Sequence, residues 1–77
     1  MAFDVHVVDD EGEGVSGAHV SLSFTSLLRG VTGERSTDSD GHAEFDGYED
    51  GEIEVFVNGT GYGTYRYSNG EGITITI

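Results

Sequence analysis

The stretch TDSDGHAEF, residues 37–45, decides the fold of this 77-residue chain. Asp40-Gly41 is a strong two-residue hairpin signal, because glycine accepts the positive φ that a type I′ turn requires. After the turn, Ala43 and Phe45 alternate with polar residues, which is the period-two pattern of a strand with one buried face. The stretch therefore predicts a turn, capped by the side-chain oxygen of Asp38, that leads into a strand.

The two aspartates before Gly41 also invite comparison with a calcium-binding loop. An EF-hand loop needs oxygen ligands at positions 1, 3 and 5, glycine at position 6 and a bidentate glutamate at position 12. With Gly41 at position 6, Asp38 and Asp40 fall at positions 3 and 5. Position 1 is then Ser36 and position 12 is Gly47, so the register fails at both places. We expect no calcium site here.

The three histidines, His6, His19 and His42, are candidate zinc ligands, because neutral imidazole is a common ligand. By the alternation, His6 and His19 both lie on outward strand faces, where adjacent strands could place them side by side. Outward faces of strands often carry histidine, and ligand count alone rarely decides. We expect no metal site and no cofactor.

Period-two alternation recurs along the chain and predicts strands throughout. In the clearest example, every second residue from Ala18 to Phe24 is apolar. The segment from Thr25 to Gly33 has no clean period, so we expect a loop that leads into a short strand. The expected strands lie near residues 3–8, 18–24, 31–37, 42–46, 52–58, 62–67 and 73–77.

Seven short strands separated by glycine-rich turns favour one fold class. No stretch carries the i, i+3, i+4 spacing of an amphipathic helix, and turns recur at the spacing typical of a sandwich. The segment Asn58-Gly59-Thr60-Gly61 supplies a further turn, and Asn69-Gly70 is a second type I′ candidate. We predict an all-β fold: a single antiparallel β-sandwich with an Ig-like Greek key, formed by residues 1–77 as one domain.

The charge balance is the strongest compositional signal. Fifteen acidic residues stand against three arginines, and the net charge is -12. Such a chain is a poor ligand for nucleic acid phosphates, so we expect no nucleic acid partner. At low ionic strength its acidic residues also repel one another. At 1 M salt the Debye length falls to about 3 Å, so that repulsion is screened except between charges in contact. We expect a salt-adapted, halophilic source.

The chain lacks both cysteine and long apolar runs, and this limits the environments in which we expect it. The chain has no cysteine, so neither a disulfide nor a thiolate metal site supplements the core. The longest apolar runs, such as Val7-Val8, are too short to cross a bilayer or to form a signal-peptide core. We therefore expect no membrane span and a cytoplasmic location, or an extracellular one if the domain is excised from a larger parent.

The order of the motifs resembles that of the carboxypeptidase regulatory-like domain, a transthyretin-like β-sandwich. The matching stretches are Val5-His6-Val7-Val8-Asp9, an acidic glycine turn, residues 15–22, residues 36–45, Gly51 to Val57, and Gly61-Tyr62. Members of that family mostly act as non-catalytic accessory or interaction modules in metallocarboxypeptidases, adhesins and cell-envelope proteins, without a cofactor. The resemblance implies a non-enzymatic structural or protein-interaction module, or a cell-surface adhesion-type module.

The alternative is a hydrolase. The first strand, His6-Val7-Val8-Asp9, is similar to the start of the 5-hydroxyisourate hydrolases, in which the histidine is catalytic. Those enzymes also use an arginine, for which Arg35 is the candidate, and a C-terminal Tyr-Arg-Gly-Ser. Here Tyr65-Arg66-Tyr67-Ser68 carries tyrosine in place of the glycine, nine residues follow it, and no histidine follows His42. The enzyme hypothesis, centred on His6, therefore lacks two of its expected elements.

Residues that recognition surfaces favour gather after the middle of the chain. Phe56 is a large apolar residue on the predicted outer face of its strand, and Tyr62, Tyr65 and Arg66 follow on the next one. These four are our candidate binding residues. The alternative is that both faces of that strand are covered, or that a bulge at Gly63 turns the tyrosines into the core, because a small sandwich needs every aromatic residue it has.

Two other segments are candidates for contact with a protein partner. Leu27-Leu28 beside Arg29 forms a small apolar patch. The alternating strand from Ile73 to Ile77 is predicted to lie at a sheet edge, and edges invite pairing with another chain. We expect a protein partner or self-association through this edge.

Overall fold

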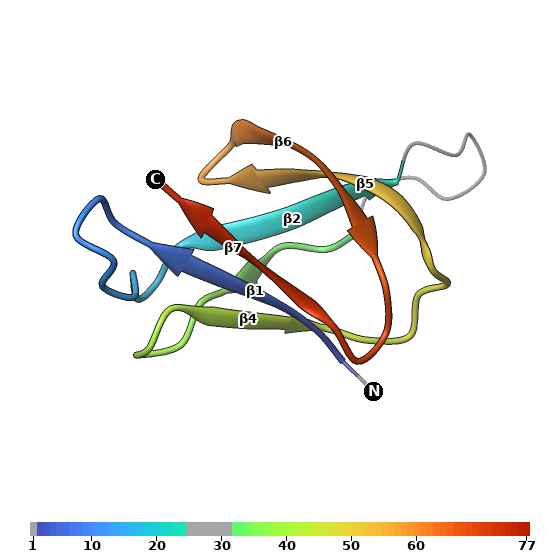
Figure 1. The fold of residues 1–77 in the computed structure, drawn as a ribbon, viewed down its shortest axis with the longest axis horizontal. Coiled ribbons are helices and arrows are strands. Elements are labelled where there is room, and N and C mark those ends of the chain that lie inside the picture. The colour runs from blue at the N-terminus through green and yellow to red at the C-terminus, as the bar shows by residue number, and fades with distance from the viewer. Residues whose placement is uncertain (1, 25–31) are drawn as a thin grey trace.

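The computed structural model describes residues 2–24 and 32–77, which form seven strands (Figure 1). This confirms the expected all-β class and the number of strands. None of the described residues forms a helix long and apolar enough to cross a membrane. The patch at residues 27–29 and the first residue of the strand expected near 31–37 lie outside the described residues. The strands are β1 (Phe3–Val8), β2 (His19–Phe24), β3 (Arg35–Ser36), β4 (His42–Phe45), β5 (Gly51–Val57), β6 (Thr60–Tyr67) and β7 (Gly72–Thr76).

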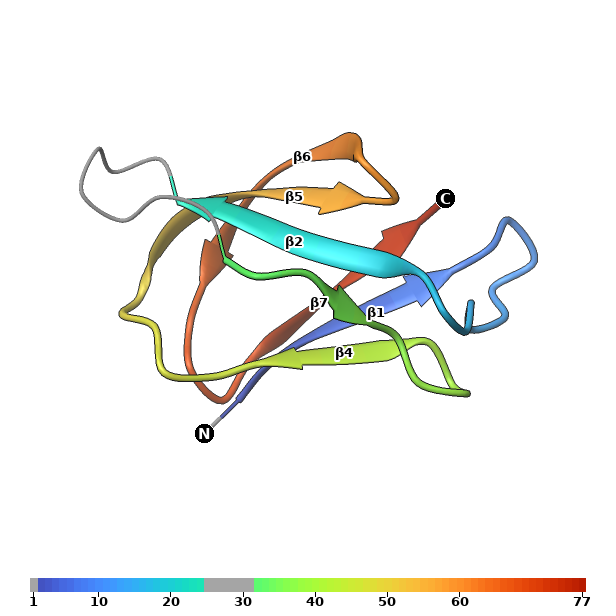
Figure 2. The same ribbon diagram turned by 180° about the vertical axis from the view of Figure 1, so that it is seen from behind.

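The strands form two sheets that face each other. One sheet has the order β4-β1-β7 and the other the order β3-β2-β5-β6. Figure 1 and Figure 2 show the two layers from opposite sides, with the chain passing from one layer to the other several times. The arrangement is the expected β-sandwich.

One strand pairing departs from the expected antiparallel arrangement. The pairs β1–β4, β2–β3, β2–β5 and β5–β6 are antiparallel, but β7 runs parallel to β1. Short turns can join only antiparallel neighbours, whereas β7 is reached from β6 in the opposite sheet. The crossing lets β7 run in the same direction as β1. β7 is an edge strand, as predicted.

The core lies between the sheets and confirms the alternation read from the sequence. Its residues come from six of the seven strands and from the residue before β2. Tyr67 is fully buried at one end, where its ring centroid lies 4.8 Å from that of Phe3. The buried cluster consists of Phe3, Val5, Val7, Ala18, Val20, Leu22, Phe24, Ala43, Phe45, Ile53, Val55, Val57, Tyr67 and Ile75.

The turn between β5 and β6 is the one two-residue hairpin that the described residues form with positive φ at both central positions. Asn58 has φ 52° and Gly59 has φ 82°, as a type I′ turn requires. Thr60 and Gly61, which we expected in the turn, already belong to β6. The hairpin is therefore tighter than predicted.

The prediction of type I′ turns at Asp40-Gly41 and Asn69-Gly70 is wrong. Only the glycine of each pair has positive φ, 89° in both cases. Each turn joins strands of different sheets, so it need not match the twist of a paired hairpin. At the first site, the Gly41 N–H donates to the Asp38 carbonyl (3.0 Å), which is a type I turn followed by a left-handed glycine.

Candidate functional site

Two histidines stack on the outer face of the three-stranded sheet. His6 in β1 and His42 in β4 are directly opposite each other in the antiparallel register. Because the Val7 N–H donates to the Gly41 carbonyl beside them (2.7 Å), they occupy a non-hydrogen-bonded pair, in which side chains approach most closely. The ring centroids lie 4.0 Å apart and the ring planes differ by 6°. The register thus fixes the stack.

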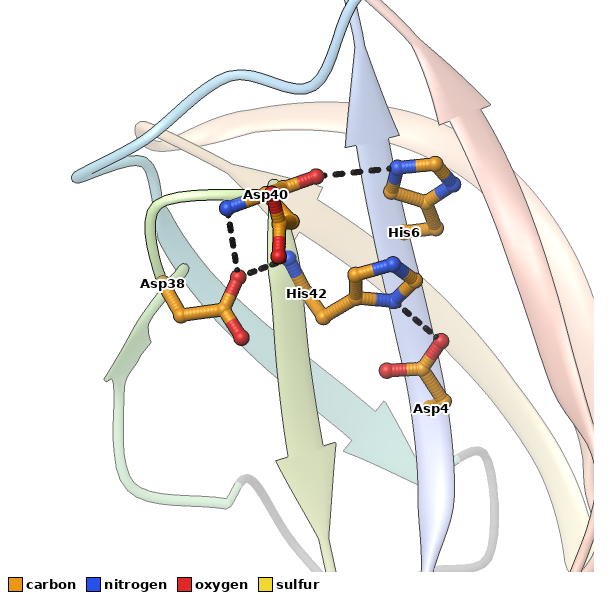
Figure 3. Close-up of polar contacts among 5 residues, drawn as sticks. All are labelled: Asp4, His6, Asp38, Asp40 and His42. Carbon is orange, nitrogen blue, oxygen red and sulfur yellow. Dashed lines mark hydrogen bonds and ion pairs between the residues drawn. The ribbon is translucent and has the colours of Figure 1, made fainter.

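Each imidazole ring is also held by an oxygen atom (Figure 3). His42 Nδ1 lies 2.7 Å from Asp4 Oδ2, and His6 Nε2 lies 3.1 Å from the carbonyl oxygen of Asp40. Carboxylate and carbonyl oxygens only accept, so His42 donates from Nδ1 and His6 from Nε2. Both rings are therefore fixed in tautomer and orientation by β1 and by the turn that precedes β4.

Charges around the stack shift two protonation equilibria. The hydrogen bond that His42 donates to Asp4 raises the pKa of His42; desolvation opposes this rise, and the nearby charges of Asp4, Asp38 and Asp40 add to it. The backbone N–H groups of His42 and Asp40 donate to Asp38 Oδ1 (3.0 and 2.9 Å) and lower the pKa of Asp38. The site favours the protonated form of His42 and the ionised form of Asp38.

An open groove adjoins His42 where the edges of the two sheets meet. Four of its residues are carboxylates, and Arg35 and His42 are the basic residues among them. The Arg35 guanidinium lies 5.9 Å from the centroid of the Phe45 ring, so its charge sits over the end of the core. The described lining consists of Asp4, Glu34, Arg35, Ser36, Asp38, His42, Ala43 and Glu44.

The Asp4–His42 pair resembles the acid–base half of a hydrolytic triad, in which a carboxylate orients an imidazole. A nucleophile in hydrogen-bond contact with the ring would be needed to complete it. Ser36 is the hydroxyl residue in the described groove lining, and its Oγ lies 3.5 Å from His19 Nδ1 instead. The groove as described thus positions a basic side chain among acids without a nucleophile next to it.

The structure places the histidines differently from the arrangement considered for zinc. His6 lies beside His42, whereas His19 is on β2 in the other sheet. His19 Nδ1 lies 3.5 Å from Glu34 Oε1 at an exposed position. Within residues 2–24 and 32–77, no three or more histidine, cysteine or acidic residues are arranged to hold a metal ion. The three histidines do not converge.

The four candidate binding residues fall on two faces of the β3-β2-β5-β6 sheet. Between Glu54 and Phe56 the pairing register shifts by one residue, and Gly63 takes φ 104°, which together form a bulge. After the bulge, Tyr62 and Tyr65 pack against the core, and the Tyr65 hydroxyl donates to the Tyr62 carbonyl (3.2 Å). The structure therefore shows the expected alternative, in which a bulge at Gly63 turns Tyr62 and Tyr65 toward the core.

Phe56 and Arg66 remain on the outer face of the same sheet. Phe56 pairs with Gly61, and a Cβ atom built on Gly61 would come 3.4 Å from the Phe56 ring. The ring therefore lies over the bare backbone of the glycine, which leaves Phe56 only partly exposed. Arg66 is exposed and pairs with Glu52.

The residues that suggested a hydrolase come from both sheets. His6 lies in the three-stranded sheet, and Arg35 lies on β3 at the edge of the other sheet. Arg66 lies on β6, at the opposite edge of that same sheet. Tyr67 is fully buried, and its hydroxyl lies 3.3 Å from the Phe45 carbonyl and 3.1 Å from Asn69 Oδ1. Burial raises the pKa of Tyr67.

The sequence alone did not reveal the contacts of Asp4 and His42. Alternation placed Asp4, His6 and His42 on outward faces, but it does not say which strands are neighbours. Once β1 is known to pair with β4, the sequence does predict the contact, because the register places His6 opposite His42.

Comparisons with known proteins support the fold only. No family model matches the chain, and a search of curated proteins found no match. Among solved structures, the Bacillus anthracis TIE protein is similar, with a TM-score of 0.69 and 14% sequence identity. The match covers 99% of this chain and 15% of that protein. At this identity the likeness shows a shared β-sandwich.

Proposed function

We propose that the chain is a non-enzymatic structural or protein-interaction module of the carboxypeptidase regulatory-like, transthyretin-like type. One observation carries the proposal: nearly the whole chain superposes on a segment that makes up only 15% of a much longer protein. The same architecture is thus used elsewhere as one folded part of a large chain. The family resemblance of the turn motifs points to the same role.

The contacts of the polar residues support a structural role. Asp4 and His42 bridge β1 and β4, and His6 bonds to the turn before β4. Asp38 is occupied by two backbone N–H groups of its own turn. Side chains that hold strands and turns together have less freedom to engage a substrate. The outward polar residues therefore serve the fold first.

Phe56 and Arg66 are the proposed contact residues for a protein partner. They lie on the outer face of the β3-β2-β5-β6 sheet, and Tyr62 and Tyr65 support that sheet from the core side. Self-association is the second route, through the free side of the edge strand β7. A monomeric mass in sedimentation velocity at both low and molar KCl would exclude the second route.

A turnover assay separates the module from the hydrolase alternative. The decay of 5-hydroxyisourate is followed by absorbance with the native chain and with the variants His6→Ala and His19→Ala. We expect every sample to match the uncatalysed rate, because Tyr67 replaces the glycine of the hydrolase motif and no histidine follows His42. Turnover by the native chain that is lost in His6→Ala and kept in His19→Ala would overturn the proposal.

The proposal extends to the salt concentration and the compartment in which the module works. A net charge of -12 suits a salt-adapted source. The compartment follows the parent chain, and an adhesion-type module of a larger surface protein would be extracellular. The chain has no cysteine, so an oxidising compartment offers it no disulfide.

A further inference from the structure

The first and last strands of the fold are parallel neighbours. β1 and β7 pair over five Cα partners, from Asp4 with Gly72 to Val8 with Thr76. Hydrogen bonds mark both ends of the ladder: the Asp4 N–H donates to the Glu71 carbonyl (3.0 Å) and the Ile77 N–H to the Val8 carbonyl (2.9 Å). The ladder therefore runs along almost the whole of both strands.

This pairing places the two termini at opposite ends of the molecule. Figure 1 shows the N-terminus beyond the start of β1 and the C-terminus beyond the end of β7, and Figure 2 shows the same separation from behind. Tension applied to the two termini pulls β1 and β7 past each other along their own direction. The ladder bonds lie across that direction, so all of them share the force at once.

We propose that the β1–β7 ladder is a mechanical clamp that lets the domain bear tension transmitted through a longer chain. The proposal rests on the proposed function as a module of such a chain. An antiparallel terminal pair would place both ends together, and force would then open the ladder one bond at a time. In the observed parallel pair, the hydrogen bonds of the ladder must break together.

The packing around the ladder fits this role. β1 is the central strand of its sheet, so the side away from β7 is held by β4. Val5, Val7 and Ile75 are buried beneath the ladder. At Gly72, a Cβ atom would come 2.7 Å from the Asp4 carbonyl oxygen, so the two backbones approach closely where the ladder begins. Sliding would disrupt this packing together with the hydrogen bonds.

The resistance of the clamp must be non-covalent. The chain contains neither cysteine nor lysine, the side chains from which covalent cross-links within a protein are commonly built. Its unfolding under force is then governed by the rate at which the native structure opens, and that rate depends on the direction of pulling. This dependence provides the test.

The test is single-molecule force spectroscopy of the full chain in two pulling directions. In the first, handles are attached at both termini. In the second, one handle stays at the C-terminus and the other is attached to the cysteine of the variant Glu11→Cys. This cysteine is the only thiol in the variant, because the native chain has none. Glu11 follows β1 in an exposed turn at the end where Ile77 bonds to Val8, so this direction peels β7 from β1.

We expect a high-force unfolding peak when the termini are pulled and its loss when Glu11 and the C-terminus are pulled. Equal force distributions in the two directions would overturn the clamp. Both directions are measured on the Glu11→Cys chain, so a difference in stability cannot mimic the result. Equal forces would leave the module proposal intact, whereas 5-hydroxyisourate turnover would overturn the module and leave a measured force asymmetry in place.

Two proline variants locate the resistance within β7. The bonds at both ends of the ladder imply that the N–H of Ile73 faces β1 and that of Thr74 faces the free edge. Ile73→Pro should therefore lose the high-force peak, and Thr74→Pro should retain it. Circular dichroism confirms that each variant is folded before pulling. Retention of the peak in folded Ile73→Pro would place the resistance outside this ladder.

Discussion

At the scale of single residues, the fold depends on side chains that bond to distant backbone groups. Thr37 is buried, and its hydroxyl accepts the Ala18 N–H (2.9 Å) and donates to the Val15 carbonyl (2.5 Å). Gly41 follows, where a Cβ atom would come 2.5 Å from the Val7 carbonyl oxygen. Asp38 caps the turn as predicted. The stretch 37–45 marks the fold because it ties the two sheets together.

The Asp4–His42 pair makes stability depend on pH in a defined direction. The folded-state pKa of His42 is raised above its ordinary value of about 6.5. The stabilisation is therefore fully present below pH 6.5 and is lost as pH rises through the folded-state pKa. Asp4→Asn keeps an acceptor but removes the charge, so it should lower the unfolding temperature more near pH 5.5 than near pH 9.

Histidine titration by NMR checks the same pair directly. In Asp4→Asn, the pKa of His42 should fall toward its ordinary value because the carboxylate is gone. His19, on the other sheet, is the internal control. Because the side chains of His42 and Asp4 are 40% and 34% exposed, water screens the pair and the shift should be moderate. An unchanged His42 titration would contradict the assigned contact.

At the scale of strands, alternation predicts faces but neither partners nor interruptions. The buried faces of β1, β2, β4 and β5 follow directly from the sequence, because each strand has one apolar side. The parallel β1–β7 pair and the stacked histidines do not, because pairing is decided by packing of the whole sandwich. The bulge in β6 was foreseen as one of two ways to bury the tyrosines, since its sole local signal is Gly63.

Alanine substitution at Gly63 tests the bulge. Gly63 has φ 104°, a conformation that residues with a side chain rarely adopt, so Gly63→Ala should destabilise the fold by about 1–3 kcal/mol. Gly33 is the matched control, because it has no positive φ and open space around its Cβ position. Gly33→Ala should change stability by less than about 0.5 kcal/mol. Urea unfolding measures both, and equal effects would argue against a strained bulge.

At the scale of the whole molecule, net charge decides how the fold responds to salt. The chain has fifteen acidic residues and three arginines, a net charge of -12. Two ion pairs among the described residues, Asp4–His42 and Glu34–His19, involve histidines that carry charge only when protonated. Because the acidic residues outnumber the arginines by twelve, most of the negative charge is compensated by solvent ions, and self-repulsion opposes the compact state at low ionic strength.

The unfolding temperature should consequently rise between low salt and about 1 M KCl, where the Debye length is about 3 Å. The rise should flatten as screening becomes complete, which distinguishes it from the continuing effect of an excluded solute such as sucrose. Glu11→Gln combined with Glu13→Gln removes two exposed charges from one turn and should reduce the salt response while raising stability at low salt. Circular dichroism measures the unfolding temperature of the native chain and of the double variant over a KCl series, and of the native chain in sucrose. A flat response of the native chain would remove the physical basis for a salt-adapted module.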